Sequence, residues 1–163
     1  LAIEGSYPGT VFYRHQRVGK NGRIFILVKF RSLISGSSAR EAGMLYEEKS
    51  TLIGKFLRKT HIDELPQVWN ILLGQMSFIG PRPEKPELIE KLSEEIPFYE
   101  MRFLIKPGIA GWAQLHNPSA GPTLKETLEK LQYDLYYLKN RSIFLDLSIV
   151  FKTIKILISG AGK

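Results

Sequence analysis

A short turn sequence between two strand-like runs constrains the fold of this chain most strongly. Residues 11–18 have the pattern of a β-strand, and residues 23–30 are rich in Ile, Phe, Leu and Val. The residues between them are Gly19-Lys20-Asn21-Gly22. Asn-Gly between two such runs is the strongest short signal for a β-hairpin. The sequence therefore predicts an antiparallel hairpin near the N-terminus.

Helix signals dominate the remainder of the chain. Thr123 and Glu126 match a capping box for a long helix with a leucine-rich face. Other helices are expected after a cap at Ser50 or Thr51, from a cap at Asp63 to a stop at Gly74, over residues 86–95 and over residues 143–158. Residues 35–48 and 106–112 are expected to form loops. The predicted fold class is α+β and mainly helical, with an N-terminal β-hairpin and several helices, some of them amphipathic and at a membrane interface.

The expected helix over residues 143–158 is apolar almost all round. A transmembrane helix needs about 20 apolar residues, and this segment is shorter and contains Asp146, Lys152 and Lys155. It is therefore too short and too charged to cross a bilayer, but it could lie in the membrane interface.

The positive charge of the chain is concentrated in its first third. The net charge at pH 7 is +7; residues 1–60 contain 11 Lys/Arg against 4 Asp/Glu, and residues 61–163 contain 12 of each. Such a patch attracts nucleic acid, anionic lipid headgroups or a phosphorylated substrate. The chain has no cysteine, which excludes disulfides and thiolate metal sites, and its three histidines lack zinc-ligand spacing.

Two adjacent carboxylates are the strongest candidates for chemistry. Asp63 and Glu64 lie at the expected start of a helix, where phosphate groups bind well, and Arg82 lies on a proline-stiffened turn, Gly80-Pro81-Arg82-Pro83. A carboxylate can attack phosphorus, Mg²⁺ is commonly held by one or two carboxylates, and arginine and lysine bind phosphate oxygens. The residues that supply these groups are Asp63, Glu64, Lys29, Arg58 and Arg82. The simpler interpretation is an N-cap Asp, a first-turn Glu and a solvated Arg.

Other polar residues receive structural interpretations. His61 stays unassigned, because a lone histidine is more often structural than catalytic. Asp134 is expected to be a buried or interfacial hydrogen-bond partner. Trp69, Trp112 and the tyrosines around Asp134 are expected to be core or interface aromatics.

Eight short stretches, in one order along nearly the whole chain, carry a resemblance to a known family. They are residues 8–14, 17–22, 28–32, 54–60, 63–67 (Asp63-Glu64-Leu65-Pro66-Gln67), 76–83 (ending in Gly80-Pro81-Arg82-Pro83), 106–109 and 133–137. Each stretch alone is weak, but the ordered series is highly specific. The chain resembles the bacterial sugar transferases, the monotopic polyprenyl-phosphate phosphoglycosyl transferases.

The resemblance implies a reaction and a place for it. The family transfers a sugar 1-phosphate from a UDP-sugar to a polyprenyl (undecaprenyl) phosphate, releases UMP and so initiates membrane glycan assembly. Asp63 matches the nucleophile that carries the phosphosugar covalently, Glu64 matches the neighbouring acid associated with Mg²⁺, and both are implied metal ligands. Lys29, Arg58 and Arg82 match basic positions around the phosphates. The implied location is the cytoplasmic face of the bacterial inner membrane, in contact with the membrane surface.

The chain departs from the family pattern at three places. Leu1-Ala2-Ile3 stands where the family has a re-entrant apolar segment, so residues 1–163 are expected to be one catalytic domain without that segment. Gln75 replaces a common Asp. Leu115-His116-Asn117-Pro118-Ser119-Ala120 replaces a stretch that often contains Asn-Gly-Arg, so the sugar is not implied.

Two other functions are alternatives to the enzyme. One is a non-catalytic membrane-surface scaffolding module of the same fold. The other is nucleic-acid binding, which the absence of RNP, KH and zinc-finger patterns disfavours. A homodimer stays open, because the leucine face after Thr123 could pack against a partner as well as against a core.

Overall fold

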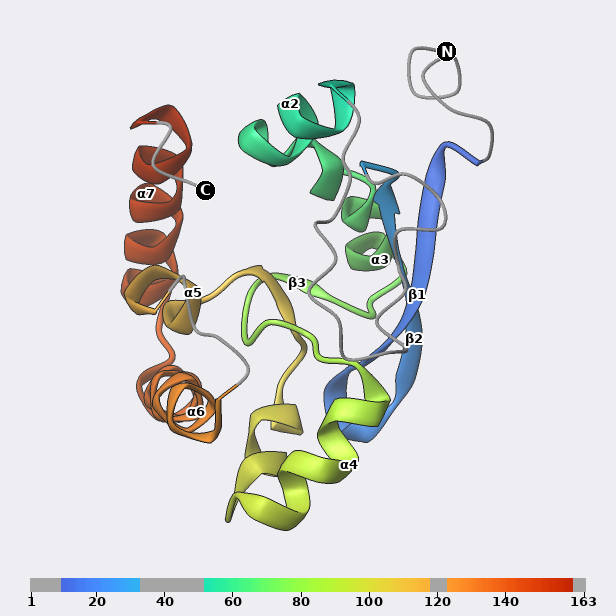
Figure 1. Ribbon diagram of the computed structural model, residues 1–163. Helices are drawn as coiled ribbons and strands as arrows, with labels where there is room; N and C mark the ends of the chain where they lie inside the picture. The colour runs from blue at the N-terminus through green and yellow to red at the C-terminus, as the bar shows by residue number, and fades with distance from the viewer. Residues whose placement is uncertain (1–9, 33–51, 118–122, 160–163) are drawn as a thin grey trace.

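The computed structural model describes residues 10–32, 52–117 and 123–159, and Figure 1 shows the arrangement of their helices and strands. Strand β1 (Phe12–Val18) pairs antiparallel with β2 (Ile24–Phe30). The turn between them, η1 (Lys20–Gly22), places Asn21 and Gly22 at φ of 57° and 75°. Asn and Gly adopt this left-handed conformation with the least strain. The predicted hairpin is confirmed.

Most predicted helices are also confirmed. They are α2 (Leu52–Thr60), α4 (Pro86–Glu95), α6 (Leu124–Asn140) and α7 (Ile143–Ser159). The capping box is present: Glu126 N–H donates to Thr123 Oγ1, and the Glu126 carboxylate accepts from the Thr123 N–H. The predicted cap at Ser50 or Thr51 and the predicted loop over residues 35–48 lie outside the described residues. The α+β, mainly helical fold class is confirmed.

The predicted helix capped by Asp63 is wrong at its start. Asp63 lies in the middle of a short 3₁₀ helix, η3 (Ile62–Glu64), and α3 (Gln67–Leu72) begins after Pro66. The proline has φ of −61° and takes the N-cap position without a side-chain cap, because its missing N–H is tolerated at a helix start. The predicted end is right: Gly74 follows the C-cap with φ of 73°.

The loop predicted over residues 106–112 contains a strand. Strand β4 (Gly108–Ala110) pairs in parallel with β3 (Ser77–Ile79), and α5 (Trp112–His116) follows. A Cβ added to Gly108 would lie 2.1 Å from Gly80 N, so glycine permits this close approach of the two backbones. Strands of three residues carry too little alternation to be recognised from the sequence.

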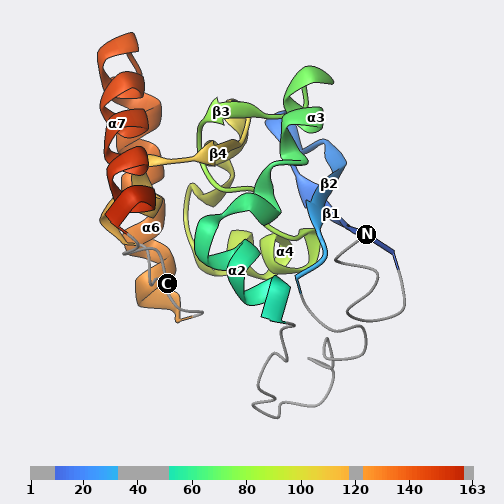
Figure 2. The same ribbon diagram turned by 90° about the horizontal axis from the view of Figure 1, so that it is seen from above.

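Two apolar clusters flank the β3–β4 pair. Phe25, Leu27 and Met76 join the hairpin to α3 and β4. Leu92, Ile96, Tyr99 and Leu131 join α4, the 3₁₀ helix η4 (Tyr99–Leu104) and α6. Figures 1 and 2 both show the short strands at the centre, with β1, β2 and α3 on one side and α6 and α7 on the other. Segments from both halves of the chain therefore meet near the centre.

Within the described ranges, no helix is both long enough and apolar enough to cross a membrane.

Candidate functional site

The candidate carboxylates lie where the chain reverses after α2. His61 adopts a left-handed conformation with φ of 54°, which ends the helix. Its N–H donates to Arg58 O at 3.2 Å, and its carbonyl accepts from Glu64 N–H at 3.1 Å. The resulting 3₁₀ turn packs against β2 and leaves Asp63 only 9% exposed. His61, unassigned from the sequence, therefore shapes the backbone that presents both carboxylates.

Glu64 is held by two cations from distant segments. Lys29 Nζ on β2 lies 2.5 Å from Glu64 Oε1, and Arg82 Nη2 lies 3.3 Å from the same oxygen. Burial opposes ionisation of Glu64, but Arg82 and Lys29 outweigh it, so the pKa of Glu64 is below its usual value. Burial also lowers the pKa of Lys29, although Glu64 opposes this shift. Three of the predicted site residues are therefore in direct contact.

Asp63 has a different environment from its neighbour. Within the described part of the chain, its carboxylate forms no ion pair. Burial raises its pKa above the usual value, with Glu64 adding to the shift and Lys29 opposing it. Glu64 is therefore tied to the surrounding cations, whereas Asp63 has a backbone hydrogen bond to its own residue and no ion pair among the described residues.

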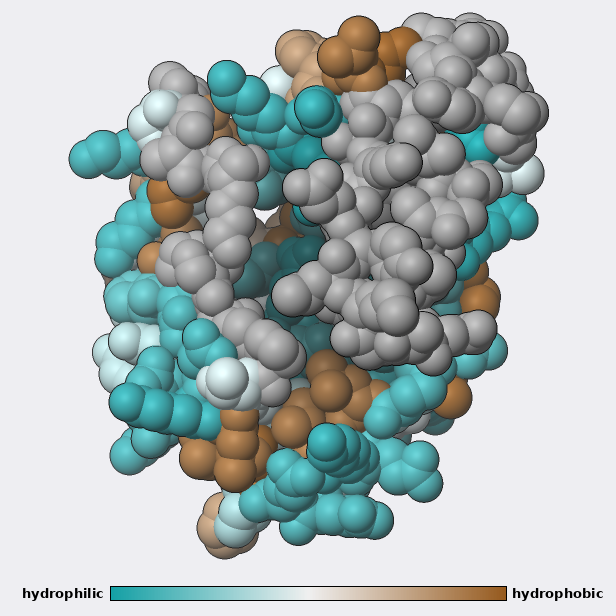
Figure 3. All heavy atoms as spheres, viewed as in Figure 1, coloured by the Kyte–Doolittle hydropathy of each residue, from teal (hydrophilic) through white to brown (hydrophobic). Residues whose placement is uncertain are grey.

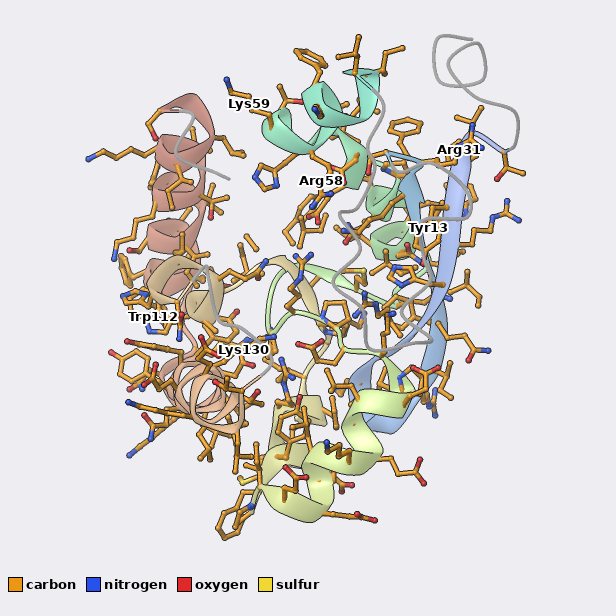
Figure 4. The ribbon with its side chains drawn as sticks, in the orientation of Figure 1. Tyr13, Arg31, Arg58, Lys59, Trp112 and Lys130 are labelled. Carbon is orange, nitrogen blue, oxygen red and sulfur yellow. The ribbon has the colours of Figure 1, made fainter. Side chains whose placement is uncertain are left out.

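Arg58 comes from the last turn of α2 and is exposed. Figure 4 shows its side chain below α2, on the side toward η3 and α3. Arg58 lies three residues before the reversal at His61, on the segment that leads to Asp63 and Glu64. The structure thus places all five predicted site residues on α2, η3, β2 and the turn after β3.

The turn that carries Arg82 has no regular secondary structure, yet each of its successive backbone carbonyl oxygens accepts a hydrogen bond. Pro81 O accepts from Gly108 N–H, and Glu84 O accepts from Val18 N–H, both at 3.0 Å. The other two acceptors bind arginine side chains: Arg82 O accepts from Arg102 Nη2, and Pro83 O from Arg17 Nη1, again at 3.0 Å. Such full pairing is what a buried irregular segment requires.

The two arginines belong to a charge network that the sequence analysis missed. Glu84 lies 3.8 Å from both Arg17 and Arg102 and also pairs with Lys130. Arg102 lies 2.7 Å from Asp134, and these two residues are 3% and 1% exposed. The prediction that Asp134 is a buried polar partner is therefore confirmed. The charged residues of this network are single and far apart in the sequence, so no local sequence pattern indicates it.

Gln75 supports the fold. Asn70 Nδ2 donates to Gln75 Oε1 at 2.8 Å and to Ile26 O at 2.7 Å, while Asn70 Oδ1 accepts from Val28 N–H at 3.2 Å. The side chain of Asn70 is 1% exposed and joins α3 to β2. The glutamine therefore completes a buried amide junction behind the segment that carries the carboxylates.

The donor set fits Mg²⁺ held together with a phosphorylated ligand. In residues 10–32, 52–117 and 123–159 there is no group of three or more metal-ligating side chains. Mg²⁺ sites often use only one or two carboxylates together with substrate phosphates and water. Glu64 Oε1 faces two cations, so its other oxygen and the Asp63 carboxylate are the groups that would hold such an ion.

Comparisons with known proteins agree with the resemblance seen in the sequence. The family model described as bacterial sugar transferase matches residues 1–160. The chain is 44% identical, over 99% of its length, to a UDP-N-acetylgalactosamine-undecaprenyl-phosphate N-acetylgalactosaminephosphotransferase of Aeromonas hydrophila, of which the match covers 38%. It is 37% identical, over 94% of its length, to a UDP-glucose:undecaprenyl-phosphate glucose-1-phosphate transferase of Escherichia coli K12, with 34% of that protein covered. The chain thus spans about a third of the length of these relatives.

Proposed function

This chain belongs to the bacterial sugar transferase family, and we propose that it transfers a sugar 1-phosphate from a UDP-sugar to a polyprenyl phosphate. The products are UMP and a polyprenyl-diphosphate sugar, which would start the assembly of a membrane glycan. The observation that carries this proposal is the contrast between the two carboxylates. Glu64 is paired with Lys29 and Arg82, whereas the adjacent Asp63 forms no ion pair within the described part of the chain.

Asp63 is the proposed nucleophile in the first half-reaction. One carboxylate oxygen attacks the phosphorus that bears the sugar, and the bond between that phosphorus and the bridging oxygen breaks. The electron pair of that bond leaves with UMP, and an acyl phosphate to Asp63 remains. Attack by one anion on another requires positive charge close to the reacting phosphates. Lys29, Arg82 and Arg58 are the proposed sources of that charge.

The second half-reaction regenerates Asp63. A phosphate oxygen of the polyprenyl phosphate attacks the phosphorus of the acyl phosphate, and the carboxylate leaves. A carboxylate that forms no ion pair with its neighbours is suited to both roles, because neither attack nor departure requires a buried ion pair to break. Covalent catalysis of this kind divides one difficult transfer into two easier ones.

Mg²⁺ is the proposed cofactor, with Glu64 and Asp63 as its protein ligands. When bound, it would supply charge neutralisation to the diphosphate of the donor. Lys29 and Arg82 keep Glu64 ionised, since they outweigh the effect of burial and lower its pKa. The two cations therefore preserve a charged ligand in a partly buried site.

A membrane surface is the proposed location of the acceptor lipid. Large apolar side chains are exposed on α7, including Phe144 at 86% and Phe151 at 67%, and on α3, where Trp69 is 62% exposed. Figure 3 shows further apolar side chains gathered over α2, where Leu52 is 86% exposed. Apolar helix faces beside basic residues are typical of segments that lie in the lipid interface. Leu124 and Leu128 on α6 are also exposed and are candidates for a homodimer contact.

The test is UMP release from a panel of UDP-sugars, with Mg²⁺ and detergent but without a lipid acceptor. Up to one UMP per protein molecule is expected, together with a phosphosugar adduct on Asp63 by intact-mass spectrometry. Asp63→Asn is expected to abolish both signals. Glu94→Gln, which changes an exposed carboxylate on α4, is the control and should retain both. Normal UMP release by Asp63→Asn would rule out Asp63 as the nucleophile.

A further inference from the structure

The guanidinium of Arg102 joins the Arg82 turn to the rest of the protein. It donates to Arg82 O at 3.0 Å and to Tyr99 Oη at 2.7 Å, and it lies 2.7 Å from Asp134 Oδ2. The side chain is 3% exposed. The carboxylate of Asp134 comes from α6, and the tyrosine comes from the same 3₁₀ helix as Arg102. A single buried group therefore connects α6, η4 and the turn.

We infer that Arg102, held by Asp134 and Tyr99, is a positioning residue that fixes the turn so that the Arg82 side chain meets Glu64. The inference rests on the proposed function for its effect on the reaction rate, but not for its effect on the structure. Arg82 has its backbone carbonyl bound to Arg102 and its side chain bound to Glu64 at 3.3 Å. A shift of the carbonyl thus moves the guanidinium that pairs with Glu64.

Only an arginine can make this set of contacts. Its planar guanidinium has five N–H donors in a fixed fork, whereas an ammonium is a compact point charge. Nη1 reaches Tyr99 and Nη2 reaches Arg82 O and Asp134. A lysine could keep the charge next to Asp134, but it would lose the simultaneous hold on the turn.

Among the described residues, Arg102 is the donor to the Arg82 carbonyl, and the other carbonyls of the turn have donors of their own. Its Gly80 N–H donates to Ala110 O, and Gly108 N–H donates to Pro81 O. The carbonyl of Arg82 is bound by Arg102 and that of Pro83 by Arg17, while Glu84 O accepts from Val18 N–H. Glu84 lies 3.8 Å from both arginines, so the two side-chain donors belong to one network.

The structural part is tested by amide hydrogen exchange, measured by NMR on wild type and Arg102→Lys. The amides of Gly108 and Val18, which bind turn carbonyls, are expected to exchange about tenfold faster in the variant because the turn opens locally. The amide of Asp146 on α7, which binds the carbonyl of Ser142 just before that helix, should be unchanged. Tyr99→Phe removes one contact of the guanidinium and should show a smaller change in the same amides. Unchanged exchange of Gly108 and Val18 in both variants would overturn the inference.

The functional part is tested by a double-mutant cycle on UMP release with Arg102→Lys and Arg82→Ala. A displacement of the order of 1 Å in a catalytic group can cost about 10²-fold in rate, and this is the expected loss for Arg102→Lys. In the Arg82→Ala background, the same change should cost no more than about twofold, because residues that act through one another are not additive. Tyr137→Phe, which removes a hydrogen bond from α6 to Asp146, is the control for a general loss of stability.

The outcomes separate the inference from the proposed function. Equal losses of the UMP-release rate for Arg102→Lys in both backgrounds would overturn the positioning role. UMP release by the wild type would then still support the reaction. No UMP from wild type would contradict the proposed function, and the exchange of Gly108 and Val18 would still decide whether Arg102 holds the turn. If Arg102→Lys fails to fold, Tyr99→Phe takes its place in both measurements, with a smaller expected effect.

Discussion

Gly108→Ala is expected to destabilise the protein more than an alanine replacement at an open glycine. The added Cβ would lie 2.1 Å from Gly80 N, 2.5 Å from Ile79 C and 2.8 Å from Ala110 O. All three are backbone atoms, so no side chain can rotate away to make room. Overpacking of this kind typically costs about 1–3 kcal/mol, and three contacts of this length place Gly108→Ala near the upper end.

The effect is measurable as a shift in the melting temperature. For domains of this size, each 1 kcal/mol lowers the midpoint by about 2–4 °C, so about 3 kcal/mol corresponds to about 6–12 °C. The control is Gly22→Ala in the hairpin turn, where the new Cβ would have no atom within 4 Å but φ is +75°. That strain costs about 1–2 kcal/mol, and the control should leave UMP release unchanged.

The test compares the melting temperatures of Gly108→Ala and Gly22→Ala. Gly108→Ala should also slow UMP release, because Gly108 N–H binds Pro81 O and the displaced strand would carry the Arg82 turn with it. A melting temperature for Gly108→Ala equal to or above that of Gly22→Ala would refute the reasoning. It would mean that β3 and β4 can separate without cost, and the close approach of the two backbones would then not hold the turn.

Four further outcomes are expected. The rate of UMP release in the first half-reaction should rise with pH, with a midpoint above 3.8. The reason is that burial raises the pKa of Asp63 and a protonated carboxyl cannot attack. A midpoint at or below 3.8 in the pH–rate profile would contradict this. Lys29→Met removes one of two cations from Glu64 and should slow UMP release by about 10²-fold, an effect that a normal single-turnover rate would disprove. Thr123→Ala should lower the free energy of unfolding by about 1 kcal/mol in urea titration without changing that rate. The pKa of Glu84 lies below 4.5, because burial is outweighed by the nearby cations Lys130, Arg102 and Arg17. As the pH falls, the unfolded state therefore binds this proton before the folded state does. The urea concentration at the unfolding midpoint should accordingly fall as the pH drops below 4.5.

The hairpin and the long helices were predictable because local signals determine them. Asn21 and Gly22 favour the left-handed turn that joins β1 to β2, and Thr123 caps α6 through contacts within one turn. Asp63, Glu64 and Arg82 were identified by residue type and by resemblance. Each of these signals occupies a few adjacent residues and does not depend on what the rest of the chain does.

The parts that the sequence did not predict depend on contacts between distant residues. Arg102 and Asp134 are 32 positions apart in the sequence, and nothing near either residue marks the pair. The β3–β4 pair depends on the absence of side chains at Gly80 and Gly108, which becomes visible only when the two backbones meet. The left-handed conformation of His61 was equally hidden, because histidine, although enriched in this conformation, adopts it at only a small minority of its positions.

The short 3₁₀ helix explains how two neighbouring carboxylates can take different roles. With three residues per turn, successive side chains leave the helix axis about 120° apart, and of the two carboxylates Glu64 is the one that pairs with Lys29 and Arg82. Glu64 points to Lys29 and Arg82, and its pKa falls because these cations outweigh burial. Asp63 forms no such pair among the described residues, and burial raises its pKa. In a helix capped by Asp63, as the sequence predicts, its carboxylate would accept from the N–H of a residue two or three positions later, whereas here its backbone hydrogen bond is to its own residue. The error in the predicted helix start therefore concerns the very feature on which the proposed nucleophile depends.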